Sequence, residues 1–158
     1  MPEAGISGRA AAAIRGIAER WGCPQFEPHV TLIGHITGEE KKIIESAGAV
    51  AKEIGQFEAN FMWTGGTDRY FKCVFVKVEM SRELEKANEL ALKRFGMKAE
   101  GEDMPHMSLA YGDMEEPRRK EILSWLPDFS GRHSIERLVV CRTTGKVEEW
   151  RDVADFKL

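Results

Sequence analysis

The 158-residue sequence has few cysteines and no long apolar run. Its three cysteines, Cys23, Cys73 and Cys141, form no Cys-x-x-Cys pair, so neither a disulfide framework nor a zinc-binding cysteine cluster is indicated. No apolar stretch is long enough to cross a bilayer, and charged residues interrupt the alanine-rich start in a way that a secretion signal does not show. These absences predict a protein of the reducing cytoplasm with no membrane partner.

An excess of charge of either sign is absent as well. The chain has 23 Lys and Arg against 26 Asp and Glu, a formal net charge of −3. Because non-specific binding of long polyanions relies on many basic contacts, this balance disfavours such binding and leaves a small anionic substrate compatible. There is also no linker rich in proline, glycine or serine, so residues 1–158 are predicted to form one domain.

Hydrophobic periodicity predicts an alternation of helices and strands. The expected helices are 6–21, 37–54, 81–95 and 117–125, and the expected strands are 29–33, 57–63, 71–78, 105–111, 135–142 and 147–156. Gly22 is expected to end the first helix, and Ser81 to cap the third. Thr37 with Glu40 makes a capping box for the second helix.

The sequence carries an inconspicuous duplication. A helix that ends in an aromatic residue and a glycine leads to PHVTL at 28–32, and a later helix with the same ending leads to PHMSL at 105–109. The later helix follows a well-formed strand, whereas only residues 1–5 precede the first. By the logic of the repeat a first strand is missing, and the sheet edge beside the first helix is expected to be open or paired with another chain, a route to a homo-oligomer.

The repeated motifs place four polar side chains where they can work together. Residues i and i+2 of a strand share a face, so His29 lies beside Thr31, and His106 beside Ser108. Two histidines can supply a base and an acid near neutral pH, while hydroxyls donate hydrogen bonds to the oxygens of a phosphate. This scheme requires no metal and no cofactor.

These two His-x-Thr/Ser motifs resemble those of the 2H phosphoesterase superfamily. Four stretches, 26–32, 70–75, 104–112 and 138–143, look most like its plant-type cyclic phosphodiesterases. The resemblance implies an α+β fold of two related lobes, with antiparallel sheets facing a central cleft and helices outside. It also implies metal-independent hydrolysis of nucleoside 2′,3′-cyclic phosphates to 2′-phosphates and of ADP-ribose 1″,2″-cyclic phosphate.

The same resemblance assigns roles to residues. It implies a catalytic set of His29, Thr31, His106 and Ser108, and substrate-binding aromatic side chains at Phe71 and Tyr111. It favours His106 as base and His29 as acid. Strict alternation from His106 puts Tyr111 on the opposite face, so a bend near Gly112 is expected. The enclosing tryptophan that relatives carry on their first strand has no counterpart here, and Trp63, Trp125 and Trp150 are interpreted as core residues.

Two other functions stay open from the sequence. Other 2H branches process RNA ends by 2′-5′ ligation or phosphodiester cleavage, which predicts a basic surface beside the cleft. A nucleotide-binding module without catalysis is the second, because the first strand and its tryptophan are missing. The remaining histidines are weaker candidates: Gly34 breaks the strand before His35, and His133 lacks the motif spacing and is interpreted as structural.

Overall fold

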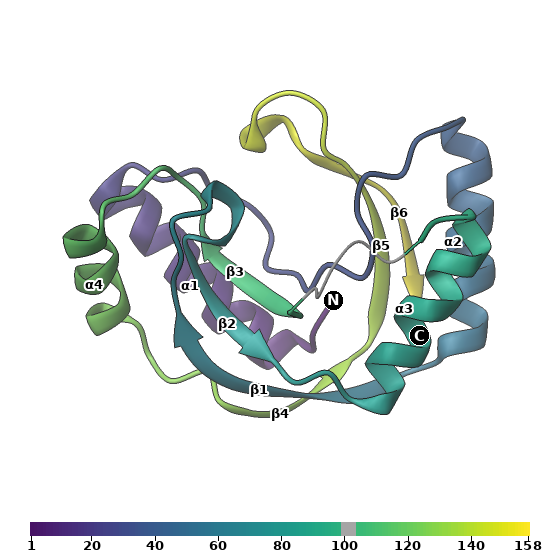
Figure 1. Cartoon of the computed structure of the whole chain (residues 1–158), viewed down its shortest axis with the longest axis horizontal. Helices are drawn as coiled ribbons and strands as arrows, with labels where there is room; N and C mark the ends of the chain where they lie inside the picture. Colours follow the sequence, from purple (N-terminus) through teal and green to yellow (C-terminus); the bar gives the residue numbers. More distant parts are fainter. Residues whose placement is uncertain (99–103) are drawn as a thin grey trace.

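Two antiparallel sheets curl around a common centre in the computed structural model, which describes residues 1–98 and 104–158 (Figure 1). One sheet has the order β3-β2-β1-β4 and the other pairs β5 with β6. The strands are β1 (Phe57–Gly65), β2 (Val74–Val78), β3 (His106–Ala110), β4 (Gly131–Ile135), β5 (Arg137–Arg142) and β6 (Arg151–Lys157). The helices are α1 (Ala4–Trp21), α2 (Glu40–Ile54), α3 (Arg82–Phe95) and α4 (Glu116–Trp125), with 3-10 turns η1 (Tyr70–Lys72) and η2 (Val147–Glu149).

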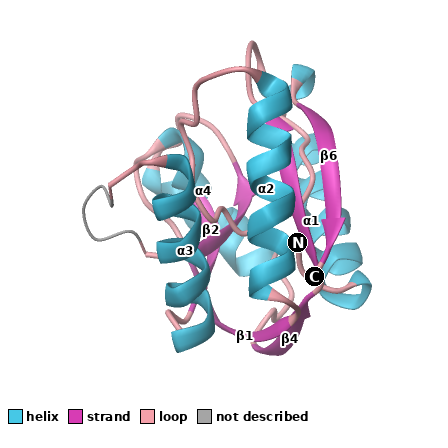
Figure 2. Ribbon diagram, turned by 90° about the vertical axis from the view of Figure 1, so that its right-hand side faces the viewer, coloured by secondary structure: helices cyan, strands magenta, loops and turns pink. Residues whose placement is uncertain are grey.

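The helices cover the outer faces of the curl. Helix α1 contacts β3 and α4 contacts β2, while α2 contacts β5, β6 and α3. In Figure 2, α2 and α3 stand side by side on the side of the molecule that faces the viewer, with β6 next to α2. In the described part of the chain, no helix has the length and apolarity needed to span a membrane.

Packing of α1 against β3 fixes which way the second motif faces. The buried stripe of α1 consists of Ile6, Ala10, Ala13, Ile14 and Ile17. It belongs to one core cluster with Met107 and Leu109, both 0% exposed. Because side chains alternate along a strand, His106 and Ser108 therefore face away from α1, into the inside of the curl.

The four predicted helices are confirmed, and so are two of their three predicted ends. Gly22 adopts a left-handed conformation with φ 70° and donates its N–H to Ala18. The Ser81 hydroxyl accepts a hydrogen bond of 3.2 Å from the Leu84 N–H. The capping box at Thr37 is wrong: α2 begins only at Glu40, and no side chain caps it. The lone hydroxyl three residues upstream is too far from the first free N–H groups of the helix.

The predicted hairpin and the predicted strand at 105–111 are confirmed as β1-β2 and β3. Phe71, however, lies in the η1 turn before β2 begins. The strand expected at 135–142 is two strands, because Glu136 turns its N–H to Met1 and the chain passes there from one sheet to the other. No strand was expected over residues 131–134 of β4, and the stretch 147–156 combines η2 with β6.

The strand expected at 29–33 is wrong. Only Val30 makes a ladder contact, an isolated antiparallel bridge with Met107. The Leu32 carbonyl accepts a hydrogen bond of 2.6 Å from the Asn88 side chain of α3 instead of joining a ladder. An apolar crevice is lined by Val30, Leu32 and Leu138, and among the described residues no strand pairs with the second edge of this segment.

Residues 1–3 form a short pairing rather than a full first strand. Pro2 bridges Ile135, and the Glu3 N–H donates to the Ser134 carbonyl at 2.7 Å. Beyond Met1, the edge of β5 opposite β6 has no backbone partner among the described residues. The expected homo-oligomer through this edge stays a prediction.

Candidate active site

The bridge between Val30 and Met107 brings the two motifs side by side. Antiparallel pairing of these residues sets His29 opposite Ser108 and Thr31 opposite His106. Directly opposed side chains point to the same face with Cβ atoms about 5 Å apart, and diagonal neighbours lie about 7–8 Å apart. By this register the two histidines are diagonal neighbours on one face.

Both imidazoles are held in the same way. Nδ1 of His29 lies 2.7 Å from the Glu27 carbonyl oxygen, and Nδ1 of His106 lies 2.9 Å from that of Met104. A carbonyl only accepts, so Nδ1 carries the hydrogen in each ring. Nε2 is therefore the atom that each histidine offers for proton transfer.

His29 is partly buried, and burial lowers its pKa below the ordinary value of 6.5. The hydrogen bond to the Glu27 carbonyl and the charge of Asp152 oppose this shift, since both favour the protonated ring. Neutral His29 is therefore the resting form at pH 7.

The two hydroxyls differ in their surroundings. Thr31 is exposed, whereas Ser108 is 4% exposed and donates a hydrogen bond of 2.9 Å to the Phe71 carbonyl. The Tyr111 side chain hydrogen-bonds to Ser108 in turn, and burial raises the pKa of Tyr111 to about 12. Ser108 must release the Phe71 carbonyl before it can donate to a phosphate oxygen.

An aromatic cluster borders this polar group. Tyr111 stacks on Phe26 with ring centroids 3.9 Å apart, and Phe71 meets Tyr111 edge-on at 5.3 Å. Tyr111 thus lies beside Ser108 although it follows β3 by one residue; the strand has ended, and Gly112 bends with φ 152°. Phe71 is 54% exposed and offers a ring face to a ligand.

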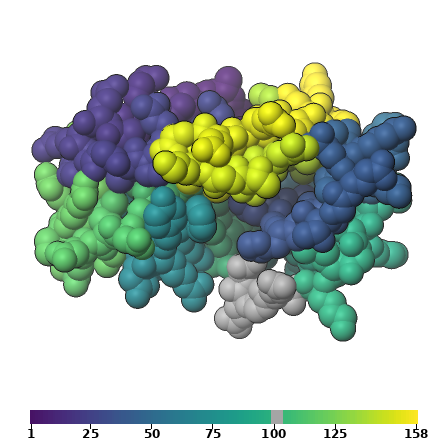
Figure 3. Space-filling model, turned by 90° about the horizontal axis from the view of Figure 1, so that it is seen from above, coloured from purple at the N-terminus to yellow at the C-terminus, as the bar shows by residue number. Residues whose placement is uncertain are grey.

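Trp150 completes the cluster, and sequence reasoning missed it. Its ring stacks near Phe71 at 5.8 Å and lies 5.9 Å from Tyr111. It is the last residue of the 143–150 segment, which Figure 3 shows lying across the middle of the molecule. The core interpretation is wrong for the other two: Trp63 is 49% exposed and Trp125 is 42% exposed. No spacing in the sequence ties a C-terminal tryptophan to motifs so far upstream.

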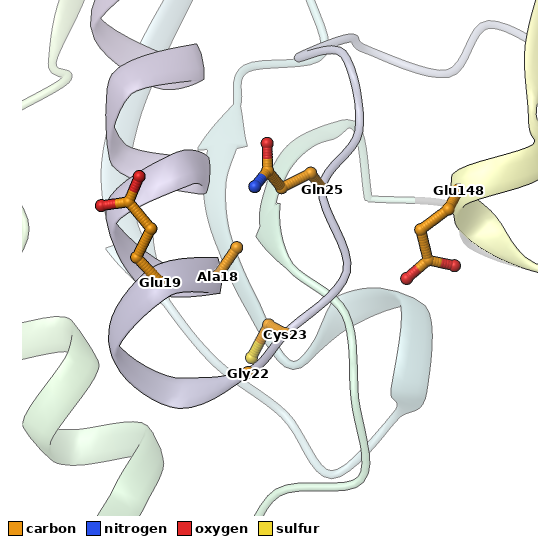
Figure 4. Close-up of a pocket in the computed structure, with 6 residues that line it drawn as sticks. All are labelled: Ala18, Glu19, Gly22, Cys23, Gln25 and Glu148. Carbon is orange, nitrogen blue, oxygen red and sulfur yellow. The ribbon is translucent and has the colours of Figure 1, made fainter.

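Beside the cluster, a cavity of about 330 Å³ opens between the end of α1 and the C-terminal segment (Figure 4). Its lining residues are Ala18, Glu19, Gly22, Cys23, Gln25 and Glu148. Burial raises the pKa of the Cys23 thiol, so this side chain is not a reactive thiolate. The lining includes two carboxylates, Glu19 and Glu148, and none of the four motif residues.

The other two histidines lie outside the constellation. His35 is exposed with φ 58°, and neither it nor Thr37 joins the paired motifs. Nδ1 of His133 lies 3.0 Å from a Glu3 carboxylate oxygen, and its ring packs edge-on against Phe61, as its structural interpretation predicts. Within residues 1–98 and 104–158, no group of three or more potential ligand side chains could hold a metal ion.

The fold is that of a known structure. Over 99% of this chain and 92% of the other, it is similar to the crystal structure of E. coli LigT complexed with 3′-AMP, with a TM-score of 0.61 and 17% sequence identity. A sequence relative is the cyclic phosphodiesterase of Arabidopsis thaliana, 30% identical over 150 residues that cover 83% of this chain and 77% of the relative.

The family described as cyclic phosphodiesterase-like protein matches residues 10–158, nearly the whole chain. The chain belongs to this family, as its two motifs suggested.

Proposed function

We propose that this protein hydrolyses cyclic phosphodiesters of nucleotides, with His29 and His106 as its proton-transfer groups. The observation that carries the proposal is the matched anchoring of the two imidazoles. Each Nδ1 binds the carbonyl two residues upstream, and the Val30–Met107 bridge sets the two rings on one face. Membership of the cyclic phosphodiesterase-like family supports the same substrate class.

The chemistry is a hydrolysis at phosphorus. Nε2 of a neutral histidine takes a proton from water as the water oxygen bonds to phosphorus. The bond from phosphorus to one ring oxygen of the cyclic ester breaks, and Nε2 of a protonated histidine gives that oxygen its proton. One water is consumed and a phosphomonoester results. We assign the base to His106 and the acid to His29.

Hydroxyls would hold the phosphate during this change. Thr31 is exposed and can donate directly, while Ser108 can turn from the Phe71 carbonyl to a non-bridging oxygen. The exposed face of Phe71 is suited to stack on the nucleobase, with Tyr111 behind it. The crystal structure of the neighbour LigT holds a nucleotide, 3′-AMP.

The test compares three variants with the native protein in excess EDTA, on a nucleoside 2′,3′-cyclic phosphate and on ADP-ribose 1″,2″-cyclic phosphate. We expect turnover that survives EDTA and a fall in kcat/KM of about a hundredfold to ten-thousandfold in His29→Ala and in His106→Ala. His35→Ala is the matched control, because His35 is an exposed histidine outside the site, and it should keep native activity.

The outcomes separate the proposal from its competitors. A nucleotide that binds without turnover would identify a binding module and overturn the proposal. Joining or cleavage of 2′-5′-linked RNA with no opening of cyclic phosphates would favour RNA-end processing. The net charge of −3 disfavours binding of long RNA and so argues against this second function.

A further inference from the structure

A row of aromatic and lysine side chains continues the site across the first sheet. Phe75 of β2 pairs with Ser108, and Lys77 pairs with His106. Directly paired residues of neighbouring strands point to the same face, so both side chains stand on the face that carries the catalytic candidates. The ring of Phe75 lies 5.6 Å from that of His106.

Trp63 of β1 extends this row by one more strand. Its ring lies 6.0 Å from that of Phe75, and 49% of the residue is exposed. The ring covers Gly65 so closely that a Cβ there would come within 2.4 Å of it. A residue without a side chain thus makes room for the indole to lie along the sheet. Because adjacent strands are about 4.8 Å apart, Trp63 lies about 10 Å from His106.

Two lysines accompany these rings. Nζ of Lys72 lies 5.6 Å from the ring centre of Phe75, and Nζ of Lys77 lies 5.6 Å from that of Trp63. We call Trp63, Phe75, Lys72 and Lys77 the aromatic-lysine strip. Phe75 is 2% exposed, so Trp63 is the ring of the strip that can receive a base. An exposed ring beside cations is what a single-stranded nucleotide requires: a planar face for the base and positive charge for the phosphate.

The charged side chains around the site indicate in which direction an elongated anionic substrate extends from it. On the side of β1 and β2 the site carries the lysines of the strip. A second phosphate of the substrate is therefore directed along the strip.

We propose that the aromatic-lysine strip binds a second nucleotide unit of the substrate, its base on Trp63 and its phosphate at Lys77. This inference rests on the proposed function, which it extends. The preferred substrate is then a short nucleotide chain ending in the cyclic phosphate, rather than a single cyclic nucleotide. The reacting nucleotide occupies the side of Phe71, and its neighbour lies across β2 on β1.

The experiment measures kcat/KM for a nucleoside 2′,3′-cyclic phosphate and for a dinucleotide that ends in the same cyclic phosphate. We expect the native protein to prefer the dinucleotide about tenfold or more, in keeping with the strength of base stacking on an aromatic residue. Trp63→Leu and Lys77→Gln should each remove most of this preference and leave the rate on the mononucleotide within about twofold.

Matched controls are available on the outer face of the molecule. Trp125→Leu changes an equally exposed tryptophan on α4, and Lys120→Gln removes an exposed lysine of the same helix. Both should keep the native preference. Equal rates on the two substrates in the native protein, or losses of the same size on both substrates in the Trp63 variant, would overturn the proposal.

If neither substrate is turned over, the proposed function is wrong. A binding measurement then still tests whether the aromatic-lysine strip binds a nucleotide. A fluorescent dinucleotide with a terminal 2′-phosphate is titrated against the native protein and Trp63→Leu, with anisotropy as the readout. Weaker binding of about tenfold in the variant supports the strip by itself. Equal binding, or none in either protein, overturns it.

Discussion

Histidine tautomers are set by the backbone at this site. In both motifs the carbonyl two residues before the histidine receives the Nδ1 hydrogen. A carbonyl orients the ring without adding negative charge, so it stabilises the imidazolium less than a carboxylate does. Burial can then dominate the pKa of His29, which makes its protonation depend on what enters the site.

The pH profile should reveal that dependence. As the acid, His29 must be protonated, and burial lowers its pKa in the free protein below 6.5. The profile of kcat/KM, which reports the free protein, should therefore fall on its alkaline side below pH 6.5. The profile of kcat should fall at higher pH, because a bound phosphate anion favours the imidazolium.

Steady-state kinetics on the cyclic nucleotide across pH 4–9, about the range in which these groups titrate, checks both limbs. Asp152→Asn provides a second test. Removing the charge that favours protonated His29 should shift the alkaline limb of the kcat/KM profile to still lower pH. If the acidic limb, and not the alkaline limb, moved in Asp152→Asn, His29 would have the role of base.

Among the elements, those with internal periodicity were predictable from the sequence. Helices α1 and α3 show a buried stripe at 3.6-residue spacing, and Gly22 and Ser81 mark ends by chemistry that is local to the chain. A strand depends on its neighbours instead. The segment 29–33 has β-branched residues, but among the described residues only Val30 has a partner in a neighbouring strand. The strand propensity of the other residues is therefore not satisfied by pairing.

The same reasoning explains what the sequence revealed of the site. The His-x-Thr and His-x-Ser spacings identified the paired motifs, because spacing within a short segment fixes which side chains share a face. Trp150 and Trp63 were missed as neighbours of the site, since their positions follow from a loop and from sheet pairing over long distances in sequence.

Helix α3 should control the position of His29 through one side chain. Asn88 donates to the Leu32 carbonyl at 2.6 Å and fixes the end of the His29 segment. We expect Asn88→Ala to lower the free energy of unfolding by about 1 kcal/mol and kcat/KM by about tenfold, because small displacements of catalytic groups are costly. Urea denaturation and steady-state kinetics measure the two effects.

Ser81→Ala is the control for this variant. It removes the cap of the same helix at a cost of about 1 kcal/mol, yet it leaves the Leu32 carbonyl bound. Its kcat/KM should stay native. If both variants lose activity in proportion to stability, the role of Asn88 is general to α3 and not specific to the His29 segment.

At the scale of the molecule, Trp150 joins the two sheets across the inside of the curl. It precedes β6 of the second sheet and stacks near Phe71, which leads into β2 of the first. We expect Trp150→Ala to raise KM for the cyclic nucleotide several-fold, because the ring backs the exposed Phe71. Trp150→Phe should restore most of the affinity, since a planar ring is kept.

Kinetics on the two variants, with Trp125→Ala as a control for the loss of a large ring elsewhere, checks this expectation. An unchanged KM in Trp150→Ala would mean that Phe71 holds its position without this contact.

The backbone segments that carry the two histidines also differ in how many interactions hold them in place. His106 belongs to a strand that pairs with β2 along its length and packs on α1. Among the described residues, the backbone around His29 is held by one bridge at Val30 and one side-chain hydrogen bond at Leu32, in addition to the packing of these two side chains against the core. Local opening of the His29 segment costs far less free energy than global unfolding. On warming, the protein should therefore lose the catalytic arrangement of its two histidines before it unfolds globally. The upper temperature limit of its activity should then be set by opening of the His29 segment and not by melting of the core.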